Sequence, residues 1–166
     1  MEKVTAVYYT TFESPVGRLF LAGDSNALLS VSFECSKRAA SPQANWKENR
    51  AIFKEAIRQL EAYFSGELRE FQLSLAIAGT EFQRRVWEAL RAIPYGETIS
   101  YAQLAVRVGN SKATRAVGLA NGSNPIPIIV PCHRVIGSDG SLTGFGGGLS
   151  TKKKLLELEQ KQLRLL

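Results

Sequence analysis

Three prolines precede a Cys-His-Arg triplet within one short segment, and they constrain the local fold more than any other feature of the chain. Residues 124–136 read Asn-Pro-Ile-Pro-Ile-Ile-Val-Pro-Cys-His-Arg-Val-Ile. Each proline fixes φ at about −65° and lacks an amide donor, and each biases the residue before it towards extended backbone. The segment therefore cannot be a helix. The sequence predicts a stiff, extended mount for the side chains at its end.

Cys132 is a candidate nucleophile because two basic side chains follow it directly. A thiol reacts as its thiolate, and its ordinary pKa is about 8.5, so a reactive cysteine needs a positive neighbour or a general base. Neighbouring side chains of an extended segment point to opposite faces, so we predict that His133 acts on Cys132 through a bridging water. Glu159, near the end of the chain, is the candidate acid that orients the imidazole. The alternative is a buried, inert cysteine.

Cysteine and histidine are too scarce for a metal site or a disulfide framework. The chain has two cysteines and one histidine, whereas a structural zinc site is usually built from Cys and His ligands alone. We predict no metal, and we expect Cys35 to be buried and inert. No opening segment resembles a signal peptide, and no apolar stretch approaches the roughly 18 residues of a membrane span. We therefore expect a soluble intracellular protein with no membrane partner.

The net charge of +6 lies entirely in the second half of the chain. Up to Gly79, nine Lys and Arg residues balance nine Asp and Glu residues, whereas from Thr80 onward twelve basic residues accompany six acidic ones. A basic lobe favours a polyanionic partner, because each neutralised phosphate releases counterions and adds affinity. From charge alone, a solvated basic face without function is an equal alternative.

The first half has the pattern of a small antiparallel sheet with one helix. Three strand-like runs are separated by turn sequences: Val4–Phe12, Leu19–Ala22 and Leu28–Phe33. Residues 36–49 are polar, so we predict a loop there. Apolar residues then recur at helical spacing from Ile52 to Phe64, and Gly66 is placed to end that helix. We predict a further strand at Phe71–Ile77 and a boundary between two lobes at Ala78-Gly79.

The second half has the pattern of short, capped helices. Thr80–Gln83 and Ser100–Gln103 both fit a capping box, and Gly109 is placed to end the second of these helices. A helix of small residues is predicted from Lys112 to Asn121, and Ser150 is predicted to cap a final helix. Helix, glycine-containing turn and helix is the outline of a helix-turn-helix, although an ordinary αα-hairpin in a core has the same pattern.

The predicted fold class is therefore α/β (α+β) with two lobes. These are a small antiparallel sheet-plus-helix lobe over residues 1–79 and a mainly α-helical lobe, with the helix-turn-helix, over residues 80–166.

The proline-flanked Cys-His-Arg segment resembles the active-site signature of the O6-alkylguanine-DNA alkyltransferase family, and this signature is highly specific. Further matches follow in order across nearly the whole second lobe: Thr80–Trp87, Ile93–Glu97, Arg115–Gly118, Gly144–Gly148 and Leu155–Glu159. The first lobe matches only in general layout, best at Ser14–Gly17 and Tyr63–Gly66. The resemblance thus rests mainly on the second half of the chain.

The resemblance implies a mode of DNA binding. In this family a helix-turn-helix binds the minor groove, and its second helix corresponds here to residues 112–121. Arg115 matches an arginine that fills the gap left by an extruded nucleotide, and a plain phosphate contact is its alternative role. Tyr101 matches a tyrosine that helps to rotate the nucleotide and protonates the leaving guanine at N3. The implied DNA contacts are Arg115, Ala116, Gly118, Lys112, Tyr101 and Arg134.

The resemblance also implies a reaction. Its substrate is O6-alkylguanine in duplex DNA, where O6 lies within the base pair, so the nucleotide must leave the stack. The alkyl group then moves to Cys132 in one irreversible event without a cofactor. Asn124 matches a residue that braces the helix-turn-helix, and Phe145 stands where some relatives have tyrosine. The implied catalytic residues are Cys132, His133, Glu159 and Tyr101, and the implied pocket residues are Asn124, Pro127, Val135, Phe145 and Gly146.

Further expectations concern the assembly and the competing functions. We expect a monomer in the cytoplasm, or in the nucleus of a eukaryote, and cooperative binding along DNA is left open. One alternative is a sensor that binds alkylated guanine without repairing it, but such relatives lack the cysteine. A Cys-His thiol hydrolase would leave the basic second lobe unexplained. A helix-turn-helix transcription regulator would leave Cys132 unexplained.

Overall fold

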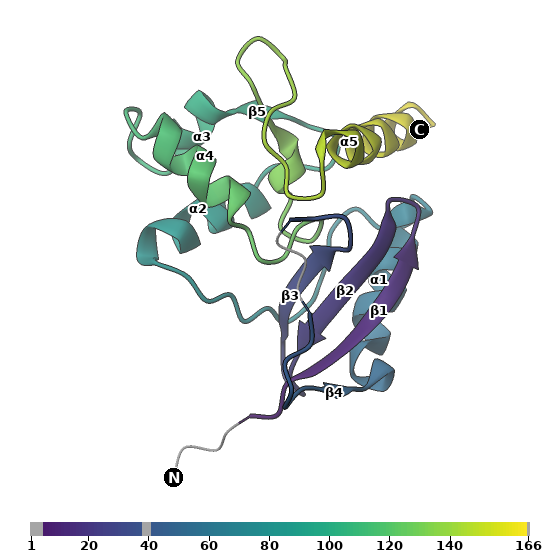
Figure 1. Ribbon diagram of the computed structural model, residues 1–166. Helices are drawn as coiled ribbons and strands as arrows, with labels where there is room; N and C mark the ends of the chain where they lie inside the picture. The colour runs from purple at the N-terminus through teal and green to yellow at the C-terminus, as the bar shows by residue number, and fades with distance from the viewer. Residues whose placement is uncertain (1–4, 38–40, 166) are drawn as a thin grey trace.

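The computed structural model describes residues 5–37 and 41–165, and it confirms the predicted mixed α/β fold with a sheet lobe and a helical lobe (Figure 1). The sheet of the first lobe has the strand order β3 (Leu28–Phe33), β2 (Gly17–Gly23), β1 (Tyr8–Ser14), β4 (Lys47–Glu48), and α1 (Lys54–Phe64) packs against it. The second lobe holds the α-helices that follow. No helix of the described residues is long and apolar enough to cross a membrane.

The first three strands form the predicted antiparallel meander. They are β1 (Tyr8–Ser14), β2 (Gly17–Gly23) and β3 (Leu28–Phe33). The β1–β2 hairpin turns at Gly17, whose φ of +100° favours glycine. In β1 the buried side chains of Thr10 and Phe12 alternate with the exposed side chains of Thr11 and Glu13, as a sheet with one solvated face requires. Val4, with which the predicted first strand begins, lies outside the described residues.

Three predictions for the first lobe were wrong. Cys35, which was expected to be buried, is exposed. The predicted loop at 36–49 contains a short strand, β4 (Lys47–Glu48), which pairs in parallel with β1. Its side chains are exposed, so the pairing rests on backbone hydrogen bonds that leave no apolar pattern. Residues 71–77, all of them described, form a single bridge between Leu75 and Leu28 rather than a strand. The edge of β3 beyond Leu28 is occupied by the second lobe, because the Val31 amide donates to the carbonyl of Pro125 at 2.9 Å.

The helices follow the predicted capping signals closely. The first is the short 3₁₀ helix η1 (Arg50–Phe53), which leads into α1 (Lys54–Phe64), and Gly66 follows with a φ of +82°. Both predicted capping boxes are present, at Thr80/Gln83 before α2 (Glu81–Arg91) and at Ser100/Gln103 before α3 (Tyr101–Arg107). The strands β5 (Ile99–Ser100) and β6 (Val135–Ile136) pair in parallel.

The last two helices have shifted boundaries. The small-residue helix is α4 (Thr114–Gly122), so it starts two residues later than predicted. The final helix is α5 (Leu149–Arg164), and its N-cap is Gly148 rather than Ser150. Gly148 has a φ of +89°, a backbone conformation that suits glycine and lets the chain turn sharply into the helix.

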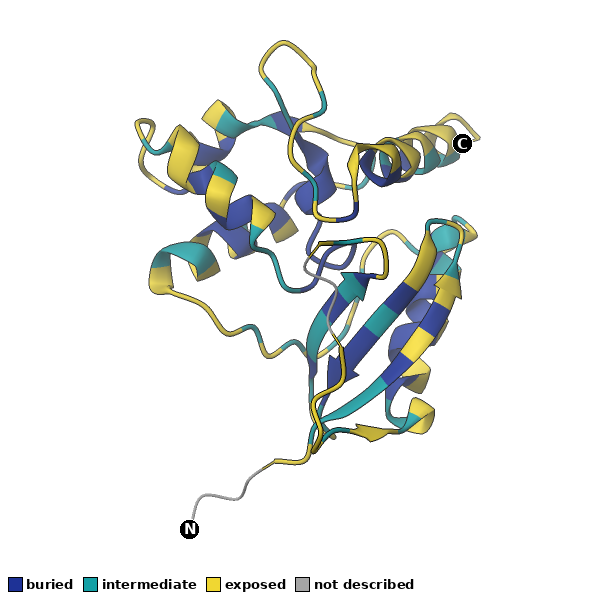
Figure 2. Cartoon of the chain, in the orientation of Figure 1, coloured by how far each residue is buried: buried dark blue, intermediate teal, exposed yellow. Residues whose placement is uncertain are grey.

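A single apolar cluster runs through both lobes. It extends from strand residues such as Leu19 and Leu21 through Tyr63 on α1 to Trp87 on α2 and Leu155 on α5. The buried residues of Figure 2 accordingly continue from the sheet into the helices that surround the Cys132 segment. The two lobes are therefore packed against one another through apolar contacts. The predicted boundary at Ala78-Gly79 stays a prediction.

Candidate active site

The proline-rich segment is a compact turn, not the extended mount that the sequence predicted. Ile128 has a φ of +74°, the amide of Val130 donates to the carbonyl of Ile126 at 2.9 Å, and residues Cys132–Arg134 form the 3₁₀ helix η2. The φ that proline imposes is as compatible with turns and 3₁₀ helices as with extended chain. Asn124 closes the turn, because its side chain accepts from the Ile126 amide and donates to the Val130 carbonyl.

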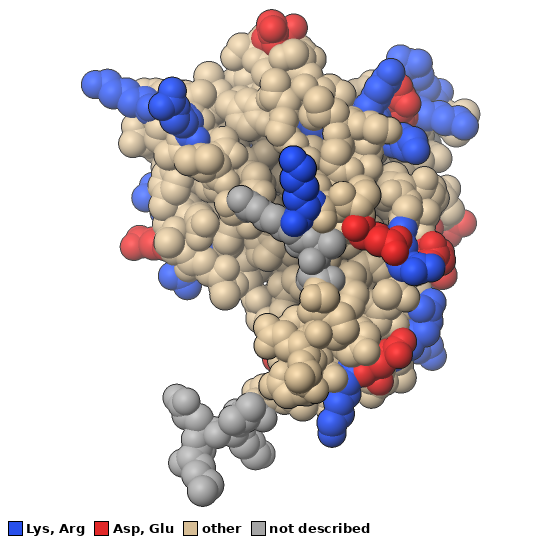
Figure 3. Space-filling view, viewed as in Figure 1, with Lys and Arg blue, Asp and Glu red and all other residues tan. Residues whose placement is uncertain are grey.

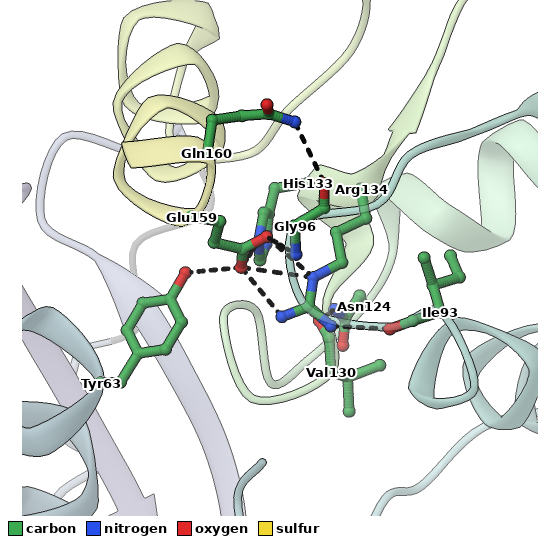
Figure 4. Close-up of polar contacts among 9 residues, drawn as sticks. All are labelled: Tyr63, Ile93, Gly96, Asn124, Val130, His133, Arg134, Glu159 and Gln160. Carbon is green, nitrogen blue, oxygen red and sulfur yellow. Dashed lines mark hydrogen bonds and ion pairs between the residues drawn. The ribbon is translucent and has the colours of Figure 1, made fainter. Parts of the chain in front are cut away.

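Glu159 lies at the centre of a buried polar cluster (Figure 4). Its Oε1 lies 2.7 Å from Nε2 of His133, so the predicted contact between these two residues is present. The guanidinium of Arg134 donates to both carboxylate oxygens at 2.9–3.2 Å, and the amide of Gly96 donates to Oε2 at 3.2 Å. The hydroxyl of Tyr63 donates to Oε1 at 2.8 Å. The carboxylate is thus held by groups from both lobes.

Arg134 does not face DNA, and its assignment as a DNA contact was wrong. Its side chain is buried, and its donors are directed to Glu159 and to the carbonyl of Ile93, at 2.7 Å in the latter case. The η2 turn points the guanidinium into the protein, where it neutralises the Glu159 carboxylate. A buried arginine whose N–H groups already bind a carboxylate has no pair of donors left to bind a phosphate.

His133 is a neutral imidazole in this setting. Burial lowers its pKa, and the opposing effect of the Glu159 carboxylate is too small to reverse that direction. Since an ionised carboxylate only accepts hydrogen bonds, Nε2 must carry the proton and Nδ1 is left with a lone pair. Nδ1 is buried and has no hydrogen-bond partner among the described residues. It is therefore an available proton acceptor on the residue that follows Cys132 in the chain.

Cys132 is held as a thiol in the resting protein. Burial raises the pKa of its thiol to about 11, although a hydrogen bond with Asn124 and the charge of Lys152 act in the opposite direction. Its carbonyl accepts from the side chain of Asn121 on α4 at 3.3 Å. A thiol with a raised pKa reacts only if a base removes its proton in the reaction itself.

Lys152 is a functional candidate that the sequence analysis missed. It is fully buried, and its ammonium donates to the carbonyls of Val135 and Thr143 at 2.6 and 2.9 Å. The ammonium also lies 5.8 Å from the ring centre of Tyr101. A signal was present: Lys152, Leu155 and Glu159 share one buried stripe of α5 at helical spacing. The run of three lysines at residues 152–154 made this helical spacing hard to recognise.

A cavity of about 220 Å³ reaches Cys132, and both lobes line it. Of the predicted pocket residues, Asn124, Pro127, Phe145 and Gly146 line the cavity. Val135 does not, because β6 turns its side chain into the core and its carbonyl binds Lys152. The residues of the first lobe and of the end of α4 that line this cavity were not predicted from the sequence. The additional lining residues include Ser30, Val31, Ser32, Phe33, Ser36 and Asn121.

Helices α3 and α4 contact each other across a short turn, as in a helix-turn-helix. The exposed residues in the middle and end of α4 are Arg115, Ala116, Leu119 and Gly122. Gly118 faces Tyr101, and a Cβ there would lie 3.8 Å from the Tyr101 ring, which is ordinary van der Waals contact. In Figure 3, basic side chains project beside these helices and from α5, as the charge distribution of the sequence indicated.

Two family models match nearly the whole chain. The 6-O-methylguanine DNA methyltransferase, DNA binding domain, matches residues 81–161, and the 6-O-methylguanine DNA methyltransferase, ribonuclease-like domain, matches residues 7–77. The chain belongs to this family. The match over 81–161 covers α2 to α4 and most of α5, so the second lobe is a DNA-binding lobe that also carries the Cys132 cavity.

Relatives named methylated-DNA–protein-cysteine methyltransferase are similar along their full length. One from Methanosarcina acetivorans is 56% identical over 153 residues, which are 92% of this chain and 98% of the relative. One from Mycobacterium tuberculosis is 50% identical over 156 residues, which are 94% of each chain.

Solved structures of the methyltransferase family share the fold. Mycobacterium tuberculosis OGT in complex with DNA superimposes with a TM-score of 0.88 at 50% identity, covering 93% of this chain and 94% of that one. The O6-methylguanine-DNA methyltransferase of Pyrococcus kodakaraensis gives a TM-score of 0.62 at 26% identity, covering 92% and 98%. The arrangement of a sheet lobe before a helical methyltransferase lobe is therefore common to these proteins and to this chain.

Proposed function

We propose that this protein repairs O6-alkylguanine in duplex DNA by moving the alkyl group to Sγ of Cys132, once per molecule. The observation that carries this proposal is a buried thiol that lines a cavity and is followed in the chain by a neutral histidine, whose Nε2 is held by a buried carboxylate. The cavity lies between the first lobe and the DNA-binding lobe, and its mainly apolar walls suit a base and a small alkyl group.

The chemical step is displacement at carbon. Nδ1 of His133 takes the thiol proton, directly or through a bridging water, and Glu159 stabilises the imidazolium that forms. The thiolate attacks the alkyl carbon, a carbon–sulfur bond forms, and the electron pair of the carbon–oxygen bond passes to guanine. Guanine gains one proton and leaves as the neutral base. The thioether has no leaving group at neutral pH, so the protein acts once and needs no cofactor.

Tyr101 is the proposed source of the proton for N3 of guanine and a guide for the rotating nucleotide. Its hydroxyl donates to the carbonyl of Thr143 at 2.9 Å, so it must exchange this partner for the base. Lys152 binds the same carbonyl and lies over the Tyr101 ring. We include Lys152 in the proposed site as the group that holds the Thr143 segment beside Tyr101.

Recognition of the lesion requires that the nucleotide leave the stack, because O6 is otherwise within the base pair. In the proposed complex α4 lies in the minor groove, where the small exposed Ala116 allows close approach and Arg115 enters the space left by the nucleotide. Lys112, which precedes α4 in the chain, contacts a phosphate of the DNA backbone. The protein acts as a monomer. It acts in the compartment that holds the DNA, which is the cytoplasm or, in a eukaryote, the nucleus.

One experiment tests the proposed function. The protein is incubated with a duplex that carries O6-methylguanine and is then weighed intact by mass spectrometry. We expect a gain of one methyl group in the wild-type protein and none in Cys132→Ser. Binding of the duplex without any mass change would contradict repair and would indicate a sensor of alkylated guanine instead.

A further inference from the structure

Tyr63 brings the first lobe into the polar cluster of the second. It lies in the last turn of α1, its side chain is fully buried, and its hydroxyl lies 2.8 Å from Oε1 of Glu159 (Figure 4). The two residues are 96 positions apart in the chain. Since an ionised carboxylate only accepts, the phenol is the donor. Burial, and the charge of Glu159, raise the pKa of Tyr63, so it keeps its proton.

Tyr63 and His133 share one oxygen atom. Oε1 of Glu159 accepts from Nε2 of His133 at 2.7 Å and from the Tyr63 hydroxyl at 2.8 Å. Two donors on one oxygen draw on the same electron density, so each weakens the bond that the other makes. The strength with which Glu159 holds the His133 proton therefore depends on the phenol of the first lobe.

The charged and titratable groups around this oxygen come from several elements. Arg134 of η2 donates to it, and the Gly96 amide after α2 donates to the second carboxylate oxygen. Tyr95 lies beneath Arg134, with Arg69 over the same ring. Lys152, on the same helix as Glu159, acts on His133 through its charge. None of these groups is removed when the Tyr63 hydroxyl is removed, so the effect of that hydroxyl can be measured alone.

We propose that Tyr63 is a positioning residue for alkyl transfer: by donating to Glu159 it sets the orientation of that carboxylate and limits the basicity of His133. This inference rests on the proposed function of Cys132 and His133. It gives the first lobe a part in the chemistry, in addition to the β3 residues that line the cavity. Tyr63 does not touch the reacting atoms and acts through Glu159.

Tyr95 provides a matched control. Its ring packs edge-on against Tyr63 with the ring centres 6.1 Å apart, and its hydroxyl is also buried. That hydroxyl has no hydrogen-bond partner in the described part of the chain. Tyr95→Phe therefore removes a phenol oxygen from the same cluster without breaking a bond to Glu159, whereas Tyr63→Phe breaks one.

The test is the pH profile of benzyl transfer from free O6-benzylguanine to Cys132 in the wild type, Tyr63→Phe and Tyr95→Phe. His133 must be neutral to accept the thiol proton, and loss of the Tyr63 bond makes Glu159 a stronger acceptor and raises the pKa of His133. The acidic limb of the Tyr63→Phe profile should move to higher pH by about 0.5–1 unit, a ~3- to 10-fold loss of rate on that limb with the plateau retained. The Tyr95→Phe profile should match the wild type.

A second measurement does not depend on alkyl transfer. The chain has one histidine, so in an untagged protein the Nε2 proton resonance in the NMR spectrum belongs to His133. A stronger bond to Glu159 should move this resonance downfield in Tyr63→Phe and leave it unchanged in Tyr95→Phe. If Tyr63→Phe does not fold, 3-fluorotyrosine at position 63, a stronger donor, should move the resonance and the acidic limb in the opposite direction.

Two outcomes would overturn the inference. The first is an unmoved acidic limb and an unmoved His133 resonance in Tyr63→Phe. The second is a rate lowered equally at every pH, which would show that Tyr63 supports only the fold. Failure of the wild-type protein itself to take up the benzyl group would instead contradict the proposed function, and the NMR comparison would still report on Tyr63.

Discussion

At the scale of single residues, Glu159 combines a stabilising and a chemical task. Burial raises the pKa of its carboxyl group, but the hydrogen bonds and charges of His133 and Arg134 outweigh that effect and lower it to about 2. The carboxylate is therefore ionised at neutral pH inside the protein. A buried ion pair of this kind is costly to break, because removal of one partner leaves the other charge buried and unpaired.

Glu159→Gln should therefore lower the free energy of unfolding by about 3–5 kcal/mol at neutral pH, because Arg134 loses its counter-charge. The free energy is measured by urea denaturation. Glu157→Gln is the matched control, since Glu157 lies on the same helix and its pair with Lys153 is exposed at 3.8 Å. That control should change stability by less than about 1 kcal/mol.

The stability difference between the wild type and Glu159→Gln should also depend on pH in the acid range. The pKa of Glu159 in the folded state, about 2, is below the ordinary carboxyl value of 4.5. The folded state thus binds fewer protons, so this contribution is complete above pH 4.5 and is lost as the pH falls towards 2. The stability difference between wild type and Glu159→Gln should shrink over that range. A difference that stays constant would contradict the ionised state of Glu159.

The sequence was a better guide to which residues make up the candidate site than to what surrounds each of them. Cys132, His133 and Glu159 are brought together as expected, because few other residues offer the same chemistry. Arg134 was assigned to DNA from the resemblance to the family, and Lys152 was missed within a run of three lysines. Burial of a charged side chain depends on partners distant in sequence, which local spacing does not reveal.

At the scale of elements, α4 positions the proposed DNA contacts. Its inner side is fixed to the core, where Nε1 of Trp87 on α2 donates to the carbonyl of Ala120 at 2.8 Å. Its outer face carries the small Ala116 and Gly122 beside the exposed Arg115 and Leu119. A helix fixed to the core in this way can present Arg115 to a groove without rearrangement.

Arg115→Ala should slow repair of O6-methylguanine in a duplex by far more than it slows reaction with free O6-benzylguanine, because only the duplex requires the nucleotide to leave the stack. Both rates are followed by intact mass. Lys54→Ala, on the surface of α1 in the first lobe, removes the same charge far from α4 and should leave both rates near wild type. Equal losses on the two substrates would remove this role from Arg115.

Elements with strong local signals were predicted well and those made by distant pairing were not. The capping boxes at Thr80 and Ser100 fixed the starts of α2 and α3 almost to the residue. The strand β4 and the bridge at Leu75 depend on backbone groups of β1 and β3, and no side-chain pattern marks them. The turn at 124–131 was mistaken for extended chain because proline allows both, and the choice depends on the side chain of Asn124.

At the scale of the whole molecule, the two lobes share an apolar cluster, the cavity that reaches Cys132 and the buried polar cluster around Glu159. The sequence predicted two lobes but gave no sign that β3 lines the cavity or that Tyr63 reaches Glu159. Contacts across about a hundred residues follow from packing, and only the assembled core determines which side chains meet. The lobes are therefore not expected to be independent in stability.

The protein should unfold in a single transition. One tryptophan reports on each lobe: Trp46 stacks near Phe20 in the first, and Trp87 is buried in the second. In Trp46→Phe and in Trp87→Phe, the midpoint of the remaining fluorescence change should equal that of the circular dichroism change in the same variant, since a two-state transition gives one midpoint to every probe. Separate midpoints would contradict a common core.

The bond from Asn121 to the carbonyl of Cys132 joins α4 directly to the proposed nucleophile. With α4 in the groove as proposed, this link restricts how far the sulfur can move relative to a docked duplex. A paired lesion would then reach the sulfur by opening of its base pair rather than by movement of the protein along the strand. The speed of repair at different positions should therefore follow how easily each base pair opens.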